Sequence, residues 1–380
     1  MEMTSELQDL ICRIDDPFSK EHYEKCRKHW DTLAKPLDGL GDFEELVARI
    51  GGIRHTALPS VRNRKLLLFL SDNGVVEEGV SQCGPEVTHS VAEAMSRRRS
   101  TACVMAEKAG IDVYPVDIGM IGAKLPGITD HRIREGTRNL AFEPAMNAEE
   151  LSAAILTGAR AVETLCKDGM ELLLLGEMGI GNTTTATAVS CGILGLDPEE
   201  VPGRGAGLSN EKLIHKCSVI REALKRYDMC GKRLDHAGAE PPVNEAARTV
   251  QEGVLRILIC VGGYDIAGMT GALLMAAVRR IPVVLDGLIT LSAALAATLL
   301  CPKVREILIP SHFPREPMGR RILEELKLHA VIDGNLALGE GTGAILLIPM
   351  LDVCLEYYNN GTCFDCLGIE AYQRFEEEMP

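Results

Sequence analysis

A glycine-rich loop in the middle of the chain nearly matches a nucleotide-binding motif. Residues 172–185 read LLLLGEMGIGNTTT, in which Gly176, Gly181 and Thr183 have the spacing of the G-x-x-x-x-G-K-[ST] phosphate loop. Asn182 stands where that motif has lysine. Because a di- or triphosphate needs the lysine and a magnesium site, this loop is better suited to a single phosphate at a helix N-terminus.

A second glycine-rich loop, PGRGAGLSNEKLIHK, occupies residues 202–216. We expect it to close over the phosphate from another side. Either Arg204 or Lys216 would then supply the positive charge that the first loop lacks. Together the two loops predict a nucleoside monophosphate or a sugar phosphate as ligand.

Acidic residues follow nearly every predicted strand. Any one of them could simply end a strand or cap a helix. However, the carboxyl ends of parallel strands meet at one edge of a sheet, and ligands bind there. A rim of carboxylates suits a substrate or transition state with positive charge, such as an oxocarbenium-like anomeric carbon. The residues of this expected rim are Asp72, Asp117, Glu177, Asp286, Asp333 and Glu340.

Short apolar runs alternate with longer helical patterns along the chain. This alternation predicts an α/β, doubly wound fold with a mainly parallel sheet flanked by helices. The runs expected to form strands are residues 65–74, 111–119, 171–179, 281–287, 305–312 and 329–334.

The two ends of the chain read as helices and polar loops. We expect residues 1–59 and 346–380 to pack together as a small helical subdomain beside a large domain of residues 60–345. Residues 341–360, GTGAILLIPMLDVCLEYYNN, begin with a glycine turn and predict a helix of well over three turns.

Composition limits the classes of function. The 380 residues are 46% hydrophobic and 25% charged, as in globular proteins, and the net charge of -14 disfavours nucleic acid or anionic membranes as partners. The acidic start lacks a signal-peptide core, and charges interrupt the apolar region 257–300, so we expect a cytoplasmic protein without membrane insertion.

Cysteine and histidine patterns indicate no metal site. Thirteen scattered cysteines favour reduced thiols over a disulfide framework. Cys363 and Cys366 form an isolated C-x-x-C, which we interpret as structural or incidental thiols rather than zinc ligands. No H-E-x-x-H or G-x-S-x-G motif occurs, so metallohydrolase and serine hydrolase chemistry is not indicated. We expect neither a metal nor a cofactor.

Several motifs, in order along almost the whole chain, carry a family resemblance: SDNGVVEEGVS, GEMGIGNTTT, GRGAGL, VGGYDIAGMTGALLMAA, PVVLDGLITLSAALAA, LIPSHF and LGEGTGA. The chain resembles the nicotinate-nucleotide:dimethylbenzimidazole phosphoribosyltransferase family. The resemblance implies transfer of the 5-phosphoribosyl group from nicotinate mononucleotide to a benzimidazole nitrogen, which gives α-ribazole phosphate for the lower ligand of cobalamin. It also implies small-molecule substrates and a homodimer.

The resemblance further implies roles for individual residues. Glu340 of LGEGTGA would be the general base that takes the proton of the attacking azole, and Glu177 would be a second carboxylate that binds the azole or the ribose hydroxyls. The phosphate would lie among Gly179, Asn182, Thr183, Gly203 and Lys216. Met178 and Leu338 would wall the base pocket, and Asp286 and Gly287 would lie near the nicotinate ring.

Departures from the family pattern bear on the choice of substrate. Asn73 stands where many relatives have histidine, and Cys83 and Val91 replace polar residues near the base pocket, so another benzimidazole, a purine or a phenol is an alternative base. Pro314 and Arg315 replace a small pair after LIPSH; Arg315 is therefore a candidate ligand for the nicotinate carboxylate.

Two other classes of function remain open from the sequence. One is a phosphate-loop nucleotidase or kinase, against which Asn182 argues. The other is a noncatalytic partner of a catalytic paralogue.

Overall fold

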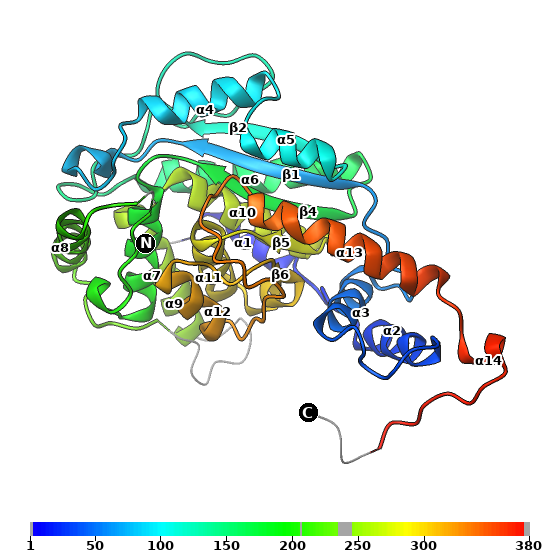
Figure 1. Ribbon diagram of the computed structural model, residues 1–380. Helices are drawn as coiled ribbons and strands as arrows, with labels where there is room; N and C mark the ends of the chain where they lie inside the picture. The colour runs from blue at the N-terminus through cyan, green and yellow to red at the C-terminus, as the bar shows by residue number, and fades with distance from the viewer. Residues whose placement is uncertain (1–2, 206, 235–244, 376–380) are drawn as a thin grey trace.

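A six-stranded parallel sheet forms the centre of the molecule, which a computed structural model describes over residues 3–205, 207–234 and 245–375 (Figure 1). The strand order β3-β2-β1-β4-β5-β6 reverses direction between β1 and β4, the position at which doubly wound sheets bind ligands. The predicted α/β doubly wound fold is therefore confirmed. The strands are β1 (Arg64–Ser71), β2 (Asp112–Gly119), β3 (Thr129–Asp130), β4 (Leu172–Met178), β5 (Val283–Leu285) and β6 (Leu308–Pro310).

Helices cover both faces of the sheet, and further helices form the two ends of the chain (Figure 1). They are α1 (Ser5–Cys12), α2 (Lys20–Thr32), α3 (Asp42–Arg54), α4 (Glu86–Ser96), α5 (Thr101–Lys108), α6 (Ala148–Lys167), α7 (Asn182–Leu194), α8 (Asn210–Arg226), α9 (Glu245–Val261), α10 (Tyr264–Arg279), α11 (Leu288–Leu300), α12 (Pro317–Glu325), α13 (Thr342–Asn360) and α14 (Phe364–Leu367). Short 3-10 helices are η1 (Gly74–Glu78), η2 (Pro198–Glu200) and η3 (Pro302–Ile307).

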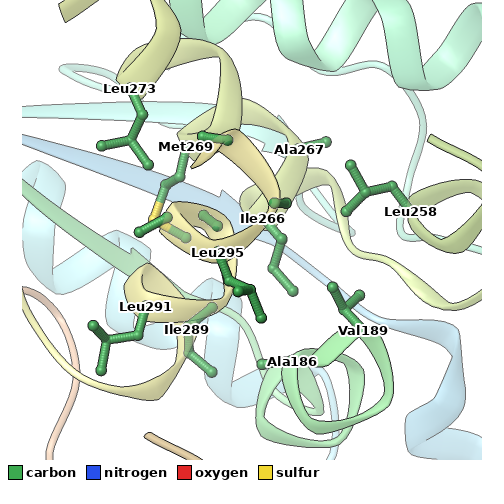
Figure 2. Packing of buried hydrophobic residues seen from close by; sticks show 14 of the residues in the cluster. Ala186, Val189, Leu258, Ile266, Ala267, Met269, Leu273, Ile289, Leu291 and Leu295 are labelled. Carbon is green, nitrogen blue, oxygen red and sulfur yellow. The ribbon is translucent and has the colours of Figure 1, made fainter. Parts of the chain in front are cut away.

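Alternate side chains of β1 enter two different hydrophobic layers. Leu67 and Phe69 pack with α6, α7, α10 and α11, whereas Leu66 and Leu68 pack with α3, α5 and α13. All four are fully buried, and each stabilises the fold by about 1.5–3 kcal/mol. Because both faces of the sheet are covered, its strands read as continuous apolar runs. Figure 2 shows the first layer, where side chains of α7, α9, α10 and α11 pack together.

Helix α10 lies unusually close to α6 through glycine. A Cβ atom on Gly158 would lie 1.7 Å from the carbonyl oxygen of Gly268, and one on Gly271 would lie 1.8 Å from that of Ile155. The two backbones are therefore in contact. This contact fixes α10, whose N-terminus reaches the end of β4.

Two expected strands differ from the observed ones. The run 305–312 forms a strand over only part of its length. Pro302 starts a 3-10 helix that continues to Ile307, so β6 is confined to Leu308–Pro310. Residues 329–334 do not form a strand, and that prediction is wrong. Their apolar part is only three residues long, and Ile332 makes a single parallel bridge to His312 before an exposed Asp-Gly turn. Strand β3, with two residues, is too short for a periodic pattern to reveal.

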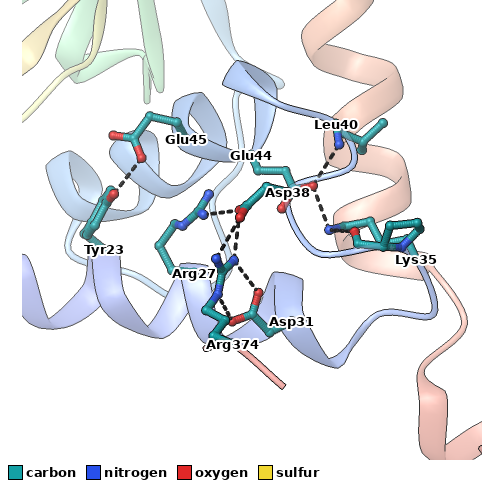
Figure 3. Close-up of polar contacts among 10 residues, drawn as sticks. Tyr23, Arg27, Asp31, Lys35, Asp38, Leu40, Glu44, Glu45 and Arg374 are labelled. Atoms are coloured by element: carbon teal, nitrogen blue, oxygen red, sulfur yellow. Dashed lines mark hydrogen bonds and ion pairs between the residues drawn. The ribbon is translucent and has the colours of Figure 1, made fainter. Parts of the chain in front are cut away.

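Residues 29–38 lie against the C-terminal part of the chain, after and beside α13. His29 hydrogen-bonds the Tyr358 carbonyl oxygen through Nε2 at 2.8 Å, and Arg374 donates to the carboxylates of Asp31 and Asp38 (Figure 3). Helix α1 instead packs against α6 and α10.

The expected long helix after the glycine turn is confirmed as α13, which spans the boundary that we placed between residues 345 and 346. The division into two domains therefore stays a prediction, and residues 1–2 and 376–380 of its terminal parts lie outside the described residues.

The C-x-x-C cysteines differ from our interpretation as thiols. Cys363 and Cys366 form a disulfide, with their Cα atoms 5.2 Å apart, a distance that suits such a bond. The turn at the start of α14 brings the two sulfurs together. The other eleven cysteines are free, as expected for a chain without a disulfide framework.

Candidate active site

One cavity of about 410 Å³ opens at the carboxyl ends of β4 and β5, a volume in the range of small-molecule sites. It brings together most of the residues selected from the sequence. Those that border it are Val91, Glu177, Met178, Gly179, Asn182, Thr183, Asp286, Gly287, Leu338 and Glu340. Those that do not are Asn73, Cys83, Gly203, Lys216 and Arg315.

The first glycine loop joins β4 to α7 at the floor of the cavity. A Cβ atom on Gly179 would lie 2.0 Å from the Ser71 carbonyl oxygen, so the loop can approach β1 this closely only with glycine. Gly181 is the N-cap of α7 at φ +91°, and it offers no side chain to the helix N-terminus. The first turn of α7, with Asn182 and Thr183, therefore presents an uncapped helix end to the cavity, which is suited to an anion.

The second glycine loop lies against the first. Arg204 and Gly205 border the cavity, but the Arg204 guanidinium donates to the Leu208 carbonyl oxygen within its own loop. Lys216 is buried behind Thr183 and donates to Thr183 Oγ1 at 3.0 Å and to the Gly203 carbonyl oxygen at 3.3 Å. Burial lowers the pKa of Lys216 to about 8. Of the two cations that the sequence offered, Lys216 is therefore the one tied to the phosphate loop.

Glu340 lies just before the N-terminus of α13 and has a left-handed backbone conformation. Its φ is +57°, between Gly339 at +91° and Gly341 at +75°, so the flanking glycines make a turn that few other residues permit. Its Oε2 accepts a hydrogen bond from the N–H of Ala102 at 3.3 Å, at the start of α5. Burial raises the pKa of Glu340, whereas the Ala102 N–H and the Ser100 hydroxyl lower it. A carboxyl group with a raised pKa suits proton transfer near neutral pH.

Asp286 holds this turn in place. Its Oδ2 accepts from the N–H of Gly341 at 3.1 Å, and its Oδ1 accepts from the N–H of Gly343 at 2.7 Å. A Cβ atom on Gly343 would lie 2.7 Å from Oδ1, so glycine is needed for this contact. Although Asp286 borders the cavity on the side expected for nicotinate, both of its oxygens are already engaged by the loop that carries Glu340.

We expect Asp286→Ala to lower kcat about five-fold through misplacement of Glu340, with less than about a two-fold change in the KM of either substrate. Asp286→Asn keeps one acceptor oxygen, so its kcat should fall less than that of Asp286→Ala. Steady-state kinetics with both substrates measure this difference, and a change confined to KM would contradict it.

Glu177 lies at the end of β4, and the side-chain amide of Asn182 donates both to Glu177 and to Asp265. Asn182 Nδ2 donates to Glu177 Oε2 and, at 3.2 Å, to Oδ2 of Asp265. Burial, followed by the charges of Asp265 and Asp286, raises the pKa of Glu177 to about 8. Burial raises the pKa of Asp265 to about 6. The sequence motif VGGYDIAG contains Asp265, but nothing in its pattern placed that residue beside the phosphate loop.

Apolar side chains form another wall of the cavity. Val91 and Met178 border it, and Leu338, 60% exposed, lies at its rim. Cys83 is exposed and lies outside the cavity. Asn73 is buried beneath the first glycine loop, where it donates to the Ile180 carbonyl oxygen and accepts from the Thr185 hydroxyl. Neither Asn73 nor Cys83 borders this cavity, and the loop after β1 turns Asn73 under the phosphate loop. Their role in a base pocket stays a prediction.

The structure does not bring Arg315 to the cavity. Its side chain is exposed, while its neighbours Pro314 and Glu316 border the cavity, because adjacent residues of an extended segment point in opposite directions. The backbone N–H of Arg315 donates to the Leu336 carbonyl oxygen, which fixes this orientation.

We therefore expect Arg315→Ala to change the KM for nicotinate mononucleotide by less than about two-fold, as for an exposed charge. Initial rates at varied nicotinate mononucleotide test this directly. A large rise in KM would instead support the contact between Arg315 and the nicotinate carboxylate that the sequence predicts.

Only half of the expected carboxylate rim faces the cavity. Asp72 Oδ2 accepts from the N–H of Ile121 at 2.8 Å, and Asp117 pairs with Arg132 at 2.7 Å. Both tie down the loops of the β1–β2 half of the sheet. Asp333 is exposed and pairs with Arg320. The members that border the cavity are Glu177, Asp286 and Glu340.

Two titratable residues that border the cavity, His312 and Glu316, were missed from the sequence. His312 follows β6, and its Nδ1–H donates to Ser311 Oγ at 2.9 Å, because the Ser311 hydroxyl itself donates to the Leu285 carbonyl oxygen at 2.7 Å. Burial lowers the pKa of His312, while the charge of Asp286 raises it. In the neutral ring with the proton on Nδ1, Nε2 is the acceptor. Glu316 accepts from the N–H of Gly205 at 3.0 Å. The strand-end rule would have found His312 had it been applied to neutral side chains.

The fold and the cavity define a class of doubly wound α/β protein that can hold a phosphorylated sugar beside carboxyl groups. A family model described as Phosphoribosyltransferase matches residues 16–369. The chain is 37% identical, over 94% of its length and 96% of the other, to the nicotinate-nucleotide–dimethylbenzimidazole phosphoribosyltransferase of Ruminiclostridium cellulolyticum. It is 35% identical to the protein of that name from Escherichia coli K12, over 95% and 94%.

A solved structure agrees with these relatives. The crystal structure of CobT from Thermus thermophilus superposes with a TM-score of 0.81 at 34% identity, over 92% of this chain and 99% of that one. The protein belongs to this phosphoribosyltransferase family.

Proposed function

We propose that the protein transfers the 5-phosphoribosyl group of nicotinate mononucleotide to dimethylbenzimidazole, giving nicotinate and α-ribazole 5'-phosphate for the lower ligand of a cobamide. The observation that carries this proposal is a cavity in which an uncapped helix N-terminus, a buried carboxyl group and an apolar wall meet. The names of the relatives support the choice of substrates.

In this reaction the phosphate lies on the first turn of α7. The N–H groups of this turn and the Thr183 hydroxyl donate to the phosphate oxygens. Lys216 donates to Thr183 Oγ1 from behind, which leaves the Thr183 O–H proton free for the phosphate. Gly203 supplies the carbonyl oxygen that holds the Lys216 ammonium in place.

Glu340 acts on the incoming base. Its carboxylate accepts the proton of one azole nitrogen, and the lone pair of the other nitrogen attacks the anomeric carbon with inversion. The bond from that carbon to the pyridinium nitrogen breaks, and its electron pair neutralises the leaving nicotinate ring. The leaving group therefore needs no acid. Val91, Met178 and Leu338 bury the apolar part of the base.

Purified protein incubated with nicotinate mononucleotide and dimethylbenzimidazole tests the proposal. We expect nicotinate release in step with a product of the mass of α-ribazole phosphate. A panel of purines, other azoles and phenols in place of dimethylbenzimidazole would show whether another base is preferred. No release with any base would instead favour a noncatalytic partner.

We further propose a homodimer that acts in the cytoplasm. Leu346, Met350 and Val353 are exposed at the spacing of one helix face on α13, which is an apolar surface suited to a second copy. Among the described residues we find no helix with the length and apolarity needed to cross a membrane. Sedimentation equilibrium should give twice the chain mass, and Val353→Glu should shift it toward the monomer.

A further inference from the structure

Glu177 and Asp265 form a buried carboxyl pair joined by one amide. Each accepts a hydrogen bond from Nδ2 of Asn182, and Asp265 is fully buried while Glu177 is 8% exposed. Two negative charges this close in a buried site repel one another and lose their hydration. Such pairs commonly hold one proton between them, which gives the two carboxyl groups different roles.

The charges that face the pair add to this repulsion. Asp286 after β5 and Glu340 before α13 face Glu177, and Asp72 after β1 faces Asp265. Among the described residues, no lysine or arginine is one of the main groups that shift the pKa of either member. The local charge is therefore negative, and a bound proton relieves it.

The backbone decides which member keeps the proton. Asp265 lies in the first turn of α10, where its Oδ1 accepts from the N–H of Ile266 at 2.9 Å and the helix dipole favours an anion. Glu177 lies on a strand, with Oε2 bound to Asn182 and Oε1 beside Gly339 on the cavity side. Asp265 is thus the better carboxylate, and the pKa of Glu177 is the higher of the two.

We propose that this pair holds a single proton at neutral pH, so that Glu177 is a neutral O–H donor toward a hydroxyl oxygen of the bound sugar and Asp265 is the positioning residue that keeps the proton there. The identity of the sugar rests on the proposed function, whereas the proton on Glu177 does not. Glu340 keeps the separate role of accepting the azole proton.

Infrared spectra of the ligand-free protein test the protonation. At neutral pH the wild type should show the C=O band of a protonated carboxyl group that Glu177→Gln lacks. Asp265→Asn removes a like charge, so it should lower the pKa of Glu177, and the band should vanish at a lower pH than in the wild type. Asp333→Asn, at an exposed ion pair, is the matched control and should leave the band as in the wild type. A wild-type spectrum with no band that depends on Glu177 would overturn the proposal.

Kinetics at neutral pH test the donor role. Because glutamine also presents an N–H donor at this position, Glu177→Gln should retain at least about ten times the kcat/KM of Glu177→Ala, the effect expected of one buried hydrogen bond. If glutamine is as damaging as alanine, Glu177 acts as a carboxylate and the donor role is wrong. A protein inactive with every base would refute the proposed function, yet the infrared result would still decide the protonation.

Discussion

Replacing Glu340 with glutamine is expected to lower kcat about 10²–10⁴-fold, the range typical of a lost general base. The amide of glutamine has nearly the shape of the carboxylate but cannot accept the azole proton. Its carbonyl oxygen can still accept the hydrogen bond of the Ala102 N–H, so the turn that carries residue 340 should keep its conformation. The KM for nicotinate mononucleotide should change little, since the proposed phosphate donors are the N–H groups of the first turn of α7 and the Thr183 hydroxyl, and not Glu340.

The pH dependence gives a second test of the same role. Burial raises the pKa of Glu340, and only its ionised form is a base, so wild-type kcat should fall as the pH drops through that pKa. Glu340→Gln should lack this acidic limb. Glu356→Gln is a matched control at an exposed position of α13, the helix that follows Glu340, and it should behave as the wild type. An acidic limb that survives in Glu340→Gln would assign the proton to another group.

Local sequence patterns predicted those parts of the site that depend on neighbouring residues. The first glycine loop was recognisable because the strand, the turn and the helix N-terminus are consecutive in residues 172–194. Glu340 was selected differently, through the family resemblance of its motif LGEGTGA and as a carboxylate beyond the last expected strand.

Contacts between distant segments could not be predicted in the same way. Asn73 and Asp265 lie beneath the phosphate loop because β1 ends there and α10 begins there. The hydrogen bonds that tie them to that loop, to Ile180 and Asn182, join residues more than 80 positions apart. Arg315 lies outside the cavity for a different reason. Its position in the chain is beside the cavity, but the direction of its side chain depends on a backbone hydrogen bond to Leu336 that no motif encodes.

Replacing Lys216 with methionine is expected to reduce kcat/KM for nicotinate mononucleotide about 10- to 100-fold, the value of one or two buried hydrogen bonds to a charged group. Methionine fills much of the same volume but supplies neither the charge nor the donor to Thr183. Without that donor, the Thr183 hydroxyl can turn its proton toward the protein instead of the phosphate. The loss should appear mainly in KM, because the phosphate is remote from the reacting bond.

Nicotinate riboside, which lacks the phosphate, separates this role from a general loss of structure. If Lys216 serves the phosphate, Lys216→Met should lower kcat/KM for the mononucleotide but leave that for the riboside nearly as in the wild type. Lys212→Met, at an exposed position of the same helix, should affect neither. Equal losses with both substrates would mean that Lys216 only supports the fold.

The titration of Lys216 adds a pH signature. Its folded pKa, lowered by burial to about 8, means that the ammonium loses its proton above that pH, well before an exposed lysine would. The KM for nicotinate mononucleotide should therefore rise above about pH 8 in the wild type and stay flat in Lys216→Met. Bound phosphate stabilises the ammonium, so the pKa of Lys216 should be higher in the complex than in the free protein. Any effect of this titration on kcat, which is measured at saturation, should therefore begin at a higher pH than the rise in KM. The buried lysine behind the loop would then do what the missing lysine at position 182 does in a nucleotide loop, but for one phosphate and through a hydroxyl group.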